Sequence, residues 1–304
     1  MKQLGASLGL CMVLLVAWDT ALAKVKVVAT LGDLAATARA VAGEHAEVVM
    51  LARPQQDPHF VDAKPSFVRE VAQADLLVVN GMSLEVGWLP ALLENASNAR
   101  VQMGQIGYFD ASTVIERKQV PGVRVTRAMG DVHPEGNPHY TYEPKQMARV
   151  GLALGKRLAR IDPANASSYK KQARGFAREA LLTFKRWRKK FASLPATRRD
   201  VVTHHAAWIY VLEWLDLRQV ATVEPKPGVQ PSPQRVAEVV EKMRQEDVPL
   251  ILLMEYYPSR FAETLAEKTG AQVLTSQGQA REEQTYFERI NALAKAIYKA
   301  LKPA

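Results

Sequence analysis

Short apolar runs alternate with amphipathic segments along the chain from residue 24 onward. Runs of strand length lie at 24–30, 47–51 and 75–80, and the segments between them have the apolar spacing of helices. The third run is apolar throughout its centre, as expected of a strand covered on both faces. A fourth strand is predicted around Val101. Strands that alternate with helices at this spacing predict a parallel sheet with helical crossovers.

The second half of the chain repeats this pattern after a long helical stretch. One helix is predicted from Pro144 to Leu158, and a second, about thirty residues long, from 162 to 195. Further strands are predicted at 200–203, 219–223, 249–254 and 272–275, each followed by a helix. The predicted fold is α/β, with an N-terminal lobe (24–143), a helical connection (144–197) containing one long rigid helix, and a C-terminal lobe (198–304).

The first 23 residues have the pattern of an export signal. Lys2 precedes an apolar run, and Ala21-Leu22-Ala23 forms a small-x-small cleavage pattern. We expect cleavage near Ala23 and a soluble periplasmic protein, because no later segment approaches the length needed to cross a bilayer. Cys11, the only cysteine, follows Leu10 rather than the small residue that a lipoprotein cleavage site requires. A mature chain without cysteine must build any metal site from nitrogen and oxygen ligands.

The formal net charge is +9, and basic residues concentrate in the helical segment 170–190. Apolar residues at helical spacing predict one buried stripe and a charged outer face in this segment. A solvated face is the favoured interpretation, and docking on an acidic partner or on phospholipid headgroups is the alternative. We expect no nucleic-acid partner and a monomeric protein.

Four side chains are predicted to converge, because ligands of open parallel sheets bind beyond the carboxyl ends of the strands. His59 follows the second strand, and His139 lies in the Pro- and Gly-rich loop 131–140. His205 ends the first strand of the second lobe, and Glu255 ends a very apolar strand. Three imidazoles and one carboxylate suit a four-coordinate Zn²⁺. His204 precedes His205 directly, so their side chains point to opposite faces and only one is expected in the cleft.

Several roles stay open on these residues alone. His133 is a loop residue, a partner of a ligand or an auxiliary ligand, and Glu255 could orient a histidine instead of binding the ion. A secreted zinc hydrolase, with a metal-bound water and Glu255 as general base, is a second functional hypothesis. No recognisable nucleophile, oxyanion or substrate motif supports it.

Five motifs of this chain resemble motifs of the periplasmic proteins that supply zinc or manganese to ABC importers, the ZnuA/TroA-like group of cluster A-I binding proteins. They occur in the same order along the chain as in the family. They are Asp57-Pro58-His59, Asn80-Gly81 with Glu85 and Trp88, Gly136-Asn137-Pro138-His139-Tyr140, His205 with Trp208 and Tyr210, and Glu255 after an apolar strand. The resemblance covers nearly all of the chain from residue 24. It implies a four-stranded parallel sheet with flanking helices in each lobe, one long connecting helix and a metal buried between the lobes.

The resemblance also implies His59, His139 and His205 as metal ligands, with His205 preferred to His204 because Tyr210 lies five residues later. Many members supply an aspartate from the loop after the last strand, but residues 275–279 contain none. Glu255 is therefore the expected fourth ligand, with Glu282, Glu283 or a water as alternatives. The expected function is high-affinity binding of Zn²⁺ and its delivery to an inner-membrane ABC permease, without enzymatic activity. A manganese- or iron(II)-binding homologue is the alternative.

Overall fold

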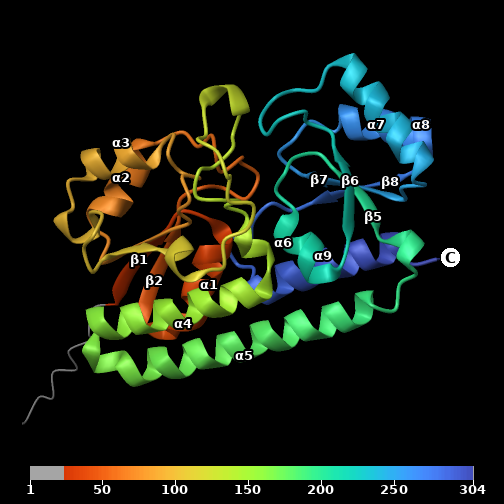
Figure 1. The fold of residues 1–304 in the computed structure, drawn as a ribbon. Helices are drawn as coiled ribbons and strands as arrows, with labels where there is room; N and C mark the ends of the chain where they lie inside the picture. The colour runs from red at the N-terminus through yellow and green to blue at the C-terminus, as the bar shows by residue number, and fades with distance from the viewer. Residues whose placement is uncertain (1–23, 304) are drawn as a thin grey trace, which may run out of the picture.

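The N-terminal lobe is built on a four-stranded parallel sheet. The computed structural model describes residues 24–303, so the predicted signal segment lies outside the described residues. The sheet has the strand order β2-β1-β3-β4. Its strands are β1 (Val25–Ala29), β2 (Ala46–Met50), β3 (Leu76–Val79) and β4 (Tyr108–Asp110), and its helices are α1 (Gly32–Ala42), α2 (Pro65–Ala72) and α3 (Leu89–Ala96). Every strand pair is parallel, as the helical crossovers predict (Figure 1).

The C-terminal lobe repeats this architecture, with the strand order β6-β5-β7-β8. Its strands are β5 (Asp200–Thr203), β6 (Arg218–Thr222), β7 (Leu250–Met254) and β8 (Gln272–Ser276), and its helices are α6 (Ile209–Leu215), α7 (Pro233–Gln245), α8 (Arg260–Thr269) and α9 (Tyr286–Leu301). Local sequence sets the helix ends: Thr285 and Glu288 form a capping box at α9, and Gly270 ends α8 in the left-handed conformation. The prediction of two lobes with four-stranded parallel sheets is confirmed.

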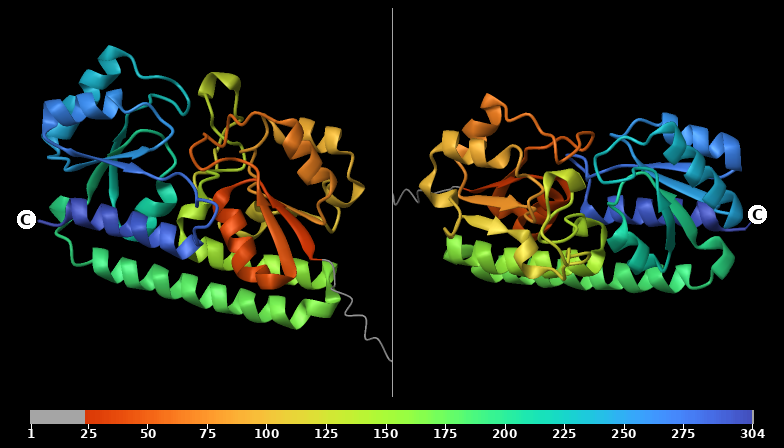
Figure 2. Two further views of the ribbon diagram at one scale, coloured as in Figure 1. Left: turned by 180° about the vertical axis from the view of Figure 1, so that it is seen from behind. Right: turned by 45° about the horizontal axis from the view of Figure 1, so that its top comes forward.

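Two antiparallel helices, α4 (Pro144–Ile161) and α5 (Ala166–Phe191), form the base of the molecule. Only α5 runs beneath both lobes, and α4 packs along its first half (Figures 1 and 2). Two glycines of α4 permit the close approach: a Cβ at Gly151 would lie 2.5 Å from the ring of Phe176, and one at Gly155 would meet Ala173. The single long helix of the prediction is therefore one arm of a helical hairpin.

The predicted strand around Val101 is wrong. Residues Ala99–Val101 form a 3₁₀ turn, and the fourth strand begins later, at Tyr108. The side chain of Asn98 accepts a hydrogen bond from the backbone N–H of Arg100, which stabilises the turn. Val101 is fully buried, so its apolar character serves the core without a strand.

The hydrophobic core extends from one lobe into the other. Buried residues of β1, β3 and α1 join those of α6 and α9 in one continuous cluster, and a second cluster lies beneath α7 and α8. A buried ion pair also crosses the interface, with Asp33 of α1 and Arg289 of α9 3.2 Å apart. Within residues 24–303, no helix has both the length and the apolar composition required to span a bilayer.

Candidate metal centre

Three histidines approach one another from separate loops at the carboxyl edges of the two sheets. His59 lies in the loop between β2 and α2, His139 precedes the 3₁₀ turn Tyr140–Tyr142 before α4, and His205 follows β5. Each offers a ring nitrogen, and these nitrogens all lie within 4.8 Å of one another. The ring centroids form a nearly equilateral triangle with sides of 5.5, 5.6 and 5.6 Å. All three side chains are buried.

The arrangement suits a divalent metal ion. Two ring nitrogens on a tetrahedral Zn²⁺ lie about 3.3 Å apart, so small side-chain rotations would bring all three onto one ion. Burial, with His59 and His205 close by, holds the pKa of His139 well below its usual range. This imidazole therefore stays neutral at physiological pH, which is the form that binds a metal.

Carboxylates orient two of the three rings. Asp57 lies 2.6 Å from Nδ1 of His59, and Glu224 lies 2.7 Å from Nδ1 of His205. Such contacts fix the ring and make Nε2 the nitrogen that can bind an ion. Burial alone would raise the pKa of Asp57, but its hydrogen bonds from His59 outweigh burial and lower it. Asp57 therefore stays ionised beside the ring.

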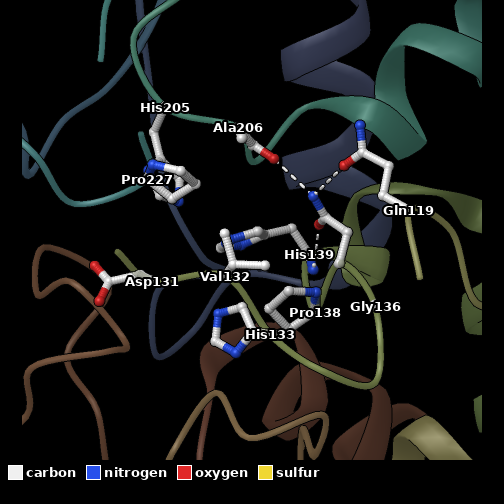
Figure 3. A pocket seen from close by; sticks show the side chains of 11 residues that line it. Gln119, Asp131, Val132, His133, Gly136, Pro138, His139, His205, Ala206 and Pro227 are labelled. Atoms are coloured by element: carbon white, nitrogen blue, oxygen red, sulfur yellow. Dashed lines mark hydrogen bonds between the residues drawn. The ribbon is translucent and has the colours of Figure 1, made fainter. Parts of the chain in front are cut away.

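Asn137 positions the third ring through the backbone. Its side-chain oxygen accepts a hydrogen bond from the backbone N–H of His139 (3.1 Å), and its amide nitrogen donates to the carbonyl of Ala206 (2.6 Å) and to Gln119 (2.9 Å) (Figure 3). One amide thus ties the loop of His139 to the loop of His205, across the lobe interface.

Glu224 and Asn137 were not predicted as functional residues from the sequence. Glu224 follows β6 at the same sheet edge where His205 follows β5, so the strand-end rule that selected the histidines could have selected it. Asn137 belongs to the family motif Gly136-Asn137-Pro138-His139-Tyr140, which by itself assigns it no contact. Its bonds depend on the meeting of two loops that are distant in sequence, which no local pattern reveals.

Glu255 follows β7, as predicted, but the structure does not bring it into the histidine cluster. Its Oε2 forms an ion pair with Arg281 (3.2 Å), and its Oε1 is buried without a hydrogen-bond partner among the described residues. Glu282 and Glu283 are exposed. Within residues 24–303, no carboxylate joins the three histidines as a possible ligand.

His133 borders the cluster, and His204 turns away from it. Nε2 of His133 lies 3.2 Å from Nε2 of His59. Burial, with His59 and His205 nearby, lowers the pKa of His133 to about 4. The ring of His204 packs against Tyr257, with centroids 4.8 Å apart. Only one of the two adjacent histidines thus enters the cluster. This was predicted, because neighbouring side chains of an extended segment point to opposite faces.

Two hollows flank the histidines, and His133 borders both. A cavity of about 130 Å³ is lined by His133, His139, His205 and Asn137 (Figure 3). A larger hollow of about 610 Å³ lies on the side of His59 and Phe60. The cluster is therefore buried but within reach of solvent from two sides.

Two α/β lobes on a shared helix, with imidazoles meeting between them, define a class of extracytoplasmic metal-binding proteins. The model of the family described as zinc-uptake complex component A, periplasmic, matches residues 27–300. The chain therefore belongs to this family, and it is a metal-binding component of a metal ABC importer rather than an enzyme. The hydrolase hypothesis is not supported.

Relatives of the chain are named for different metals. A putative metal-binding protein of Treponema pallidum (strain Nichols) is 28% identical over 285 residues, covering 91% of this chain and 87% of that protein. The manganese ABC transporter substrate-binding lipoprotein PsaA of Streptococcus anginosus is 26% identical over 260 residues, covering 83% of this chain and 80% of that protein. A crystal structure of ZnuA shares the fold, with a TM-score of 0.78 and 20% identity over 92% of this chain and all of that one.

Proposed function

We propose that this protein captures Zn²⁺ in the periplasm and delivers it to an inner-membrane ABC permease, with His59, His139 and His205 as ligands. The observation that supports it is the meeting of three imidazoles from two lobes, without a carboxylate in the cluster among the described residues. Nitrogen-rich sites favour Zn²⁺, whereas Mn²⁺ prefers more carboxylate oxygen.

The fourth ligand position is proposed for His133 or a water molecule. Glu255, the ligand expected from the sequence, would have to leave Arg281 to reach the cluster. Nε2 of His133 already lies 3.2 Å from Nε2 of His59, close to the spacing of about 3.3 Å between two ligands of a tetrahedral zinc. A shell of three or four nitrogens would keep the preference for zinc.

Competition titrations test this proposal. Metal-free protein is titrated with Zn²⁺ and, separately, with Mn²⁺ against a chelator of known affinity. We expect tighter binding of Zn²⁺. Substitution of His59, His139 or His205 by Ala should weaken it by more than the roughly 10- to 100-fold typical of losing an outer-shell partner. His45→Ala is the matched control, because His45 packs against Tyr169 outside the cluster. Unchanged zinc affinity in the three variants would refute the ligand assignment.

Manganese is the second candidate cargo, because relatives named as manganese-binding match most of the chain. The buried, unpartnered Oε1 of Glu255 is the feature that favours it, since a carboxylate oxygen is a preferred ligand of Mn²⁺. Tighter binding of Mn²⁺ than of Zn²⁺, abolished by Glu255→Gln, would establish this alternative. If Glu255→Gln leaves the affinities for both metals unchanged, Glu255 is not a ligand.

Delivery is tested by uptake of radioactive zinc into cells that lack the gene. The wild-type protein should restore uptake at low zinc concentration, and His139→Ala should not. Restoration by both proteins would contradict delivery through the histidine cluster.

A further inference from the structure

The net positive charge of this protein is confined to its helical hairpin. Residues 144–191, which contain α4 and α5, carry 14 Lys and Arg side chains against only Asp162 and Glu179, a net charge of +12. The whole chain has a net charge of +9, so all other residues together amount to −3. The basic character is therefore a property of one surface, not of the molecule as a whole.

Nine exposed cations on α5 make up this surface, here called the cationic face. They are Lys170, Lys171, Arg174, Arg178, Lys185, Arg186, Arg188, Lys189 and Lys190. At 3.6 residues per turn, most of them project from about one third of the helix circumference. Tyr169, Ala173 and Phe176 lie on the opposite, buried side of the helix. α5 thus presents two groups of cations, 170–178 and 185–190, to solvent along its outer side.

The cationic face has no anionic partner within residues 24–303, because none of its nine side chains forms an ion pair there. Cations four residues apart, such as Lys170 and Arg174 or Lys185 and Lys189, repel one another and destabilise the helix. Some cations elsewhere in the chain do form ion pairs, for example Lys26 with Glu70. The repulsion on α5 would be relieved by an anionic surface outside the molecule.

The shape of the cationic face fits a flat surface better than a small anion. α5 has 26 residues and is therefore about 39 Å long, and it is the outermost element at the base of the molecule (Figures 1 and 2). A compact anion could contact only neighbouring cations, because the nine are spread over residues 170–190 of the helix. Leu181 and Leu182, 43% and 54% exposed, lie midway along the same side. Binding to a membrane surface grows with electrostatic attraction to anionic lipids and with the apolar area that is buried, and this side of α5 offers both.

We propose that the cationic face of α5 docks on an anionic phospholipid bilayer, with Leu181 and Leu182 entering the headgroup region. A bilayer supplies both a plane of negative charge for the Lys and Arg side chains and apolar depth for the two leucines. The loops of the histidine cluster lie on the far side of α4 from α5, so this surface does not use the metal site (Figure 1). The inference is therefore independent of the proposed cargo.

Vesicle sedimentation tests the proposal with the mature chain, from residue 24 to its end. Vesicles of phosphatidylcholine are compared with vesicles that also contain anionic phosphatidylglycerol, at low and high salt. We expect binding to the anionic vesicles only, with loss at high salt because screening weakens attraction between exposed charges. The triple variant Lys171→Gln, Lys185→Gln, Lys189→Gln should lose at least about tenfold in apparent affinity, since each Lys near the surface contributes to the attraction.

A second triple variant provides the control at equal net charge. Lys242, Lys268 and Lys302 are exposed outside α5, and their replacement by Gln should leave vesicle binding unchanged. Circular dichroism verifies that both triple variants are folded. The double variant Leu181→Ser, Leu182→Ser should weaken vesicle binding without changing its salt dependence. Equal loss in both triple variants, or equal binding to neutral vesicles, would overturn the proposal. Binding to a soluble sulfated polysaccharide but not to vesicles would also overturn it and assign the face to an acidic polymer.

Discussion

Glu224 serves two loops at once at the edge of the C-terminal sheet. Its Oε2 lies 2.7 Å from Nδ1 of His205 and also accepts a hydrogen bond from the backbone N–H of Gly228 (3.0 Å). A carboxylate on Nδ1 holds the ring in one tautomer and raises the basicity of Nε2 toward a metal. If His205 binds the ion, as proposed, Glu224 acts on the metal through His205, without touching it.

Glu224→Gln should weaken zinc binding by about 10- to 100-fold while the fold is retained, because an amide cannot supply the negative charge that polarises His205. Titration with zinc in competition with a chelator measures the affinity, and circular dichroism checks the folding. Glu267→Gln, at an exposed position on α8, is the matched control and should bind zinc as the wild type does. Equal affinity of Glu224→Gln and the control would show that the carboxylate does not tune the site.

Glu85 offers a residue-scale prediction away from the cluster. It is buried and accepts hydrogen bonds from Thr30 and from the backbone N–H groups of Asn80 and Gly81. Burial raises the pKa of Glu85 from 4.5 to about 7, although these donors oppose the shift. The folded state thus holds a proton between pH 4.5 and 7 that the unfolded chain has released. The stability from this group is fully present below pH 4.5 and is lost as pH rises to about 7.

Unfolding by urea should therefore show a loss on the order of 3 kcal/mol from Glu85 between pH 4.5 and 8, at 1.36 kcal/mol per pKa unit. Glu85→Gln cannot titrate, so the stability of the metal-free variant relative to wild type should improve over this range. The variant can be less stable overall, because the amide replaces an acceptor facing Gly81. A constant difference between the two proteins from pH 4.5 to 8 would contradict the raised pKa.

The sequence could place the histidines but not their partners. Strand ends and a Pro-rich loop marked His59, His139 and His205, and the structure brings these three together. The same rule marked Glu255, which instead pairs with Arg281 from the loop after β8. Which of several nearby groups a carboxylate contacts depends on loop conformation, and hydrophobic periodicity carries no information about it.

At the scale of elements, two helical glycines face opposite environments. A Cβ at Gly32, the first residue of α1, would collide with the backbone carbonyl of Ala280, where the lobes meet. A Cβ at Gly175, on the exposed side of α5, would meet no atom within 4 Å. The first glycine is required by packing between lobes, and the second is not.

Gly32→Ala should lower the free energy of unfolding by about 1–3 kcal/mol, because backbone atoms must shift to admit the methyl group. Gly175→Ala is the matched control and should raise it by up to about 1 kcal/mol, since Ala is the better helix former. Urea denaturation of both variants measures the difference. Equal free energies of unfolding for the two variants would show that the interface at Ala280 accommodates an extra methyl group without loss of stability.

The helices and strands were largely predictable, because short stretches of sequence determine their lengths and their hydrophobic periodicity. The apolar run that became β7 and the capped segment that became α9 are examples. The 3₁₀ turn at Val101 was missed, because a single valine can pack into the hydrophobic core from a turn as well as from a strand. The pairing of α4 with α5 was also missed, since it depends on which residues of α5 lie against Gly151 and Gly155 of α4.

At the scale of the whole molecule, the lobes are joined by bonds that need no metal. The buried pair of Asp33 and Arg289 links α1 to α9, and the hydroxyl of Tyr142 donates to the carbonyl of Gly278 (2.7 Å). The backbone N–H of Asp33 donates to Gln279 (3.1 Å). These contacts, together with α5 beneath both lobes, join the lobes independently of the histidine cluster.

Zinc should nevertheless stabilise the fold, because His59 and His139 approach the ion from one side of the interface and His205 from the other. An ion that binds only the folded state adds about 2.7 kcal/mol at a free concentration of 100 times its Kd. We expect Tm of the metal-free protein to rise with zinc concentration, measured by differential scanning fluorimetry. His205→Ala should abolish the rise, whereas His45→Ala should retain it. If saturating zinc does not change the Tm, the three imidazoles do not bind one ion across the interface.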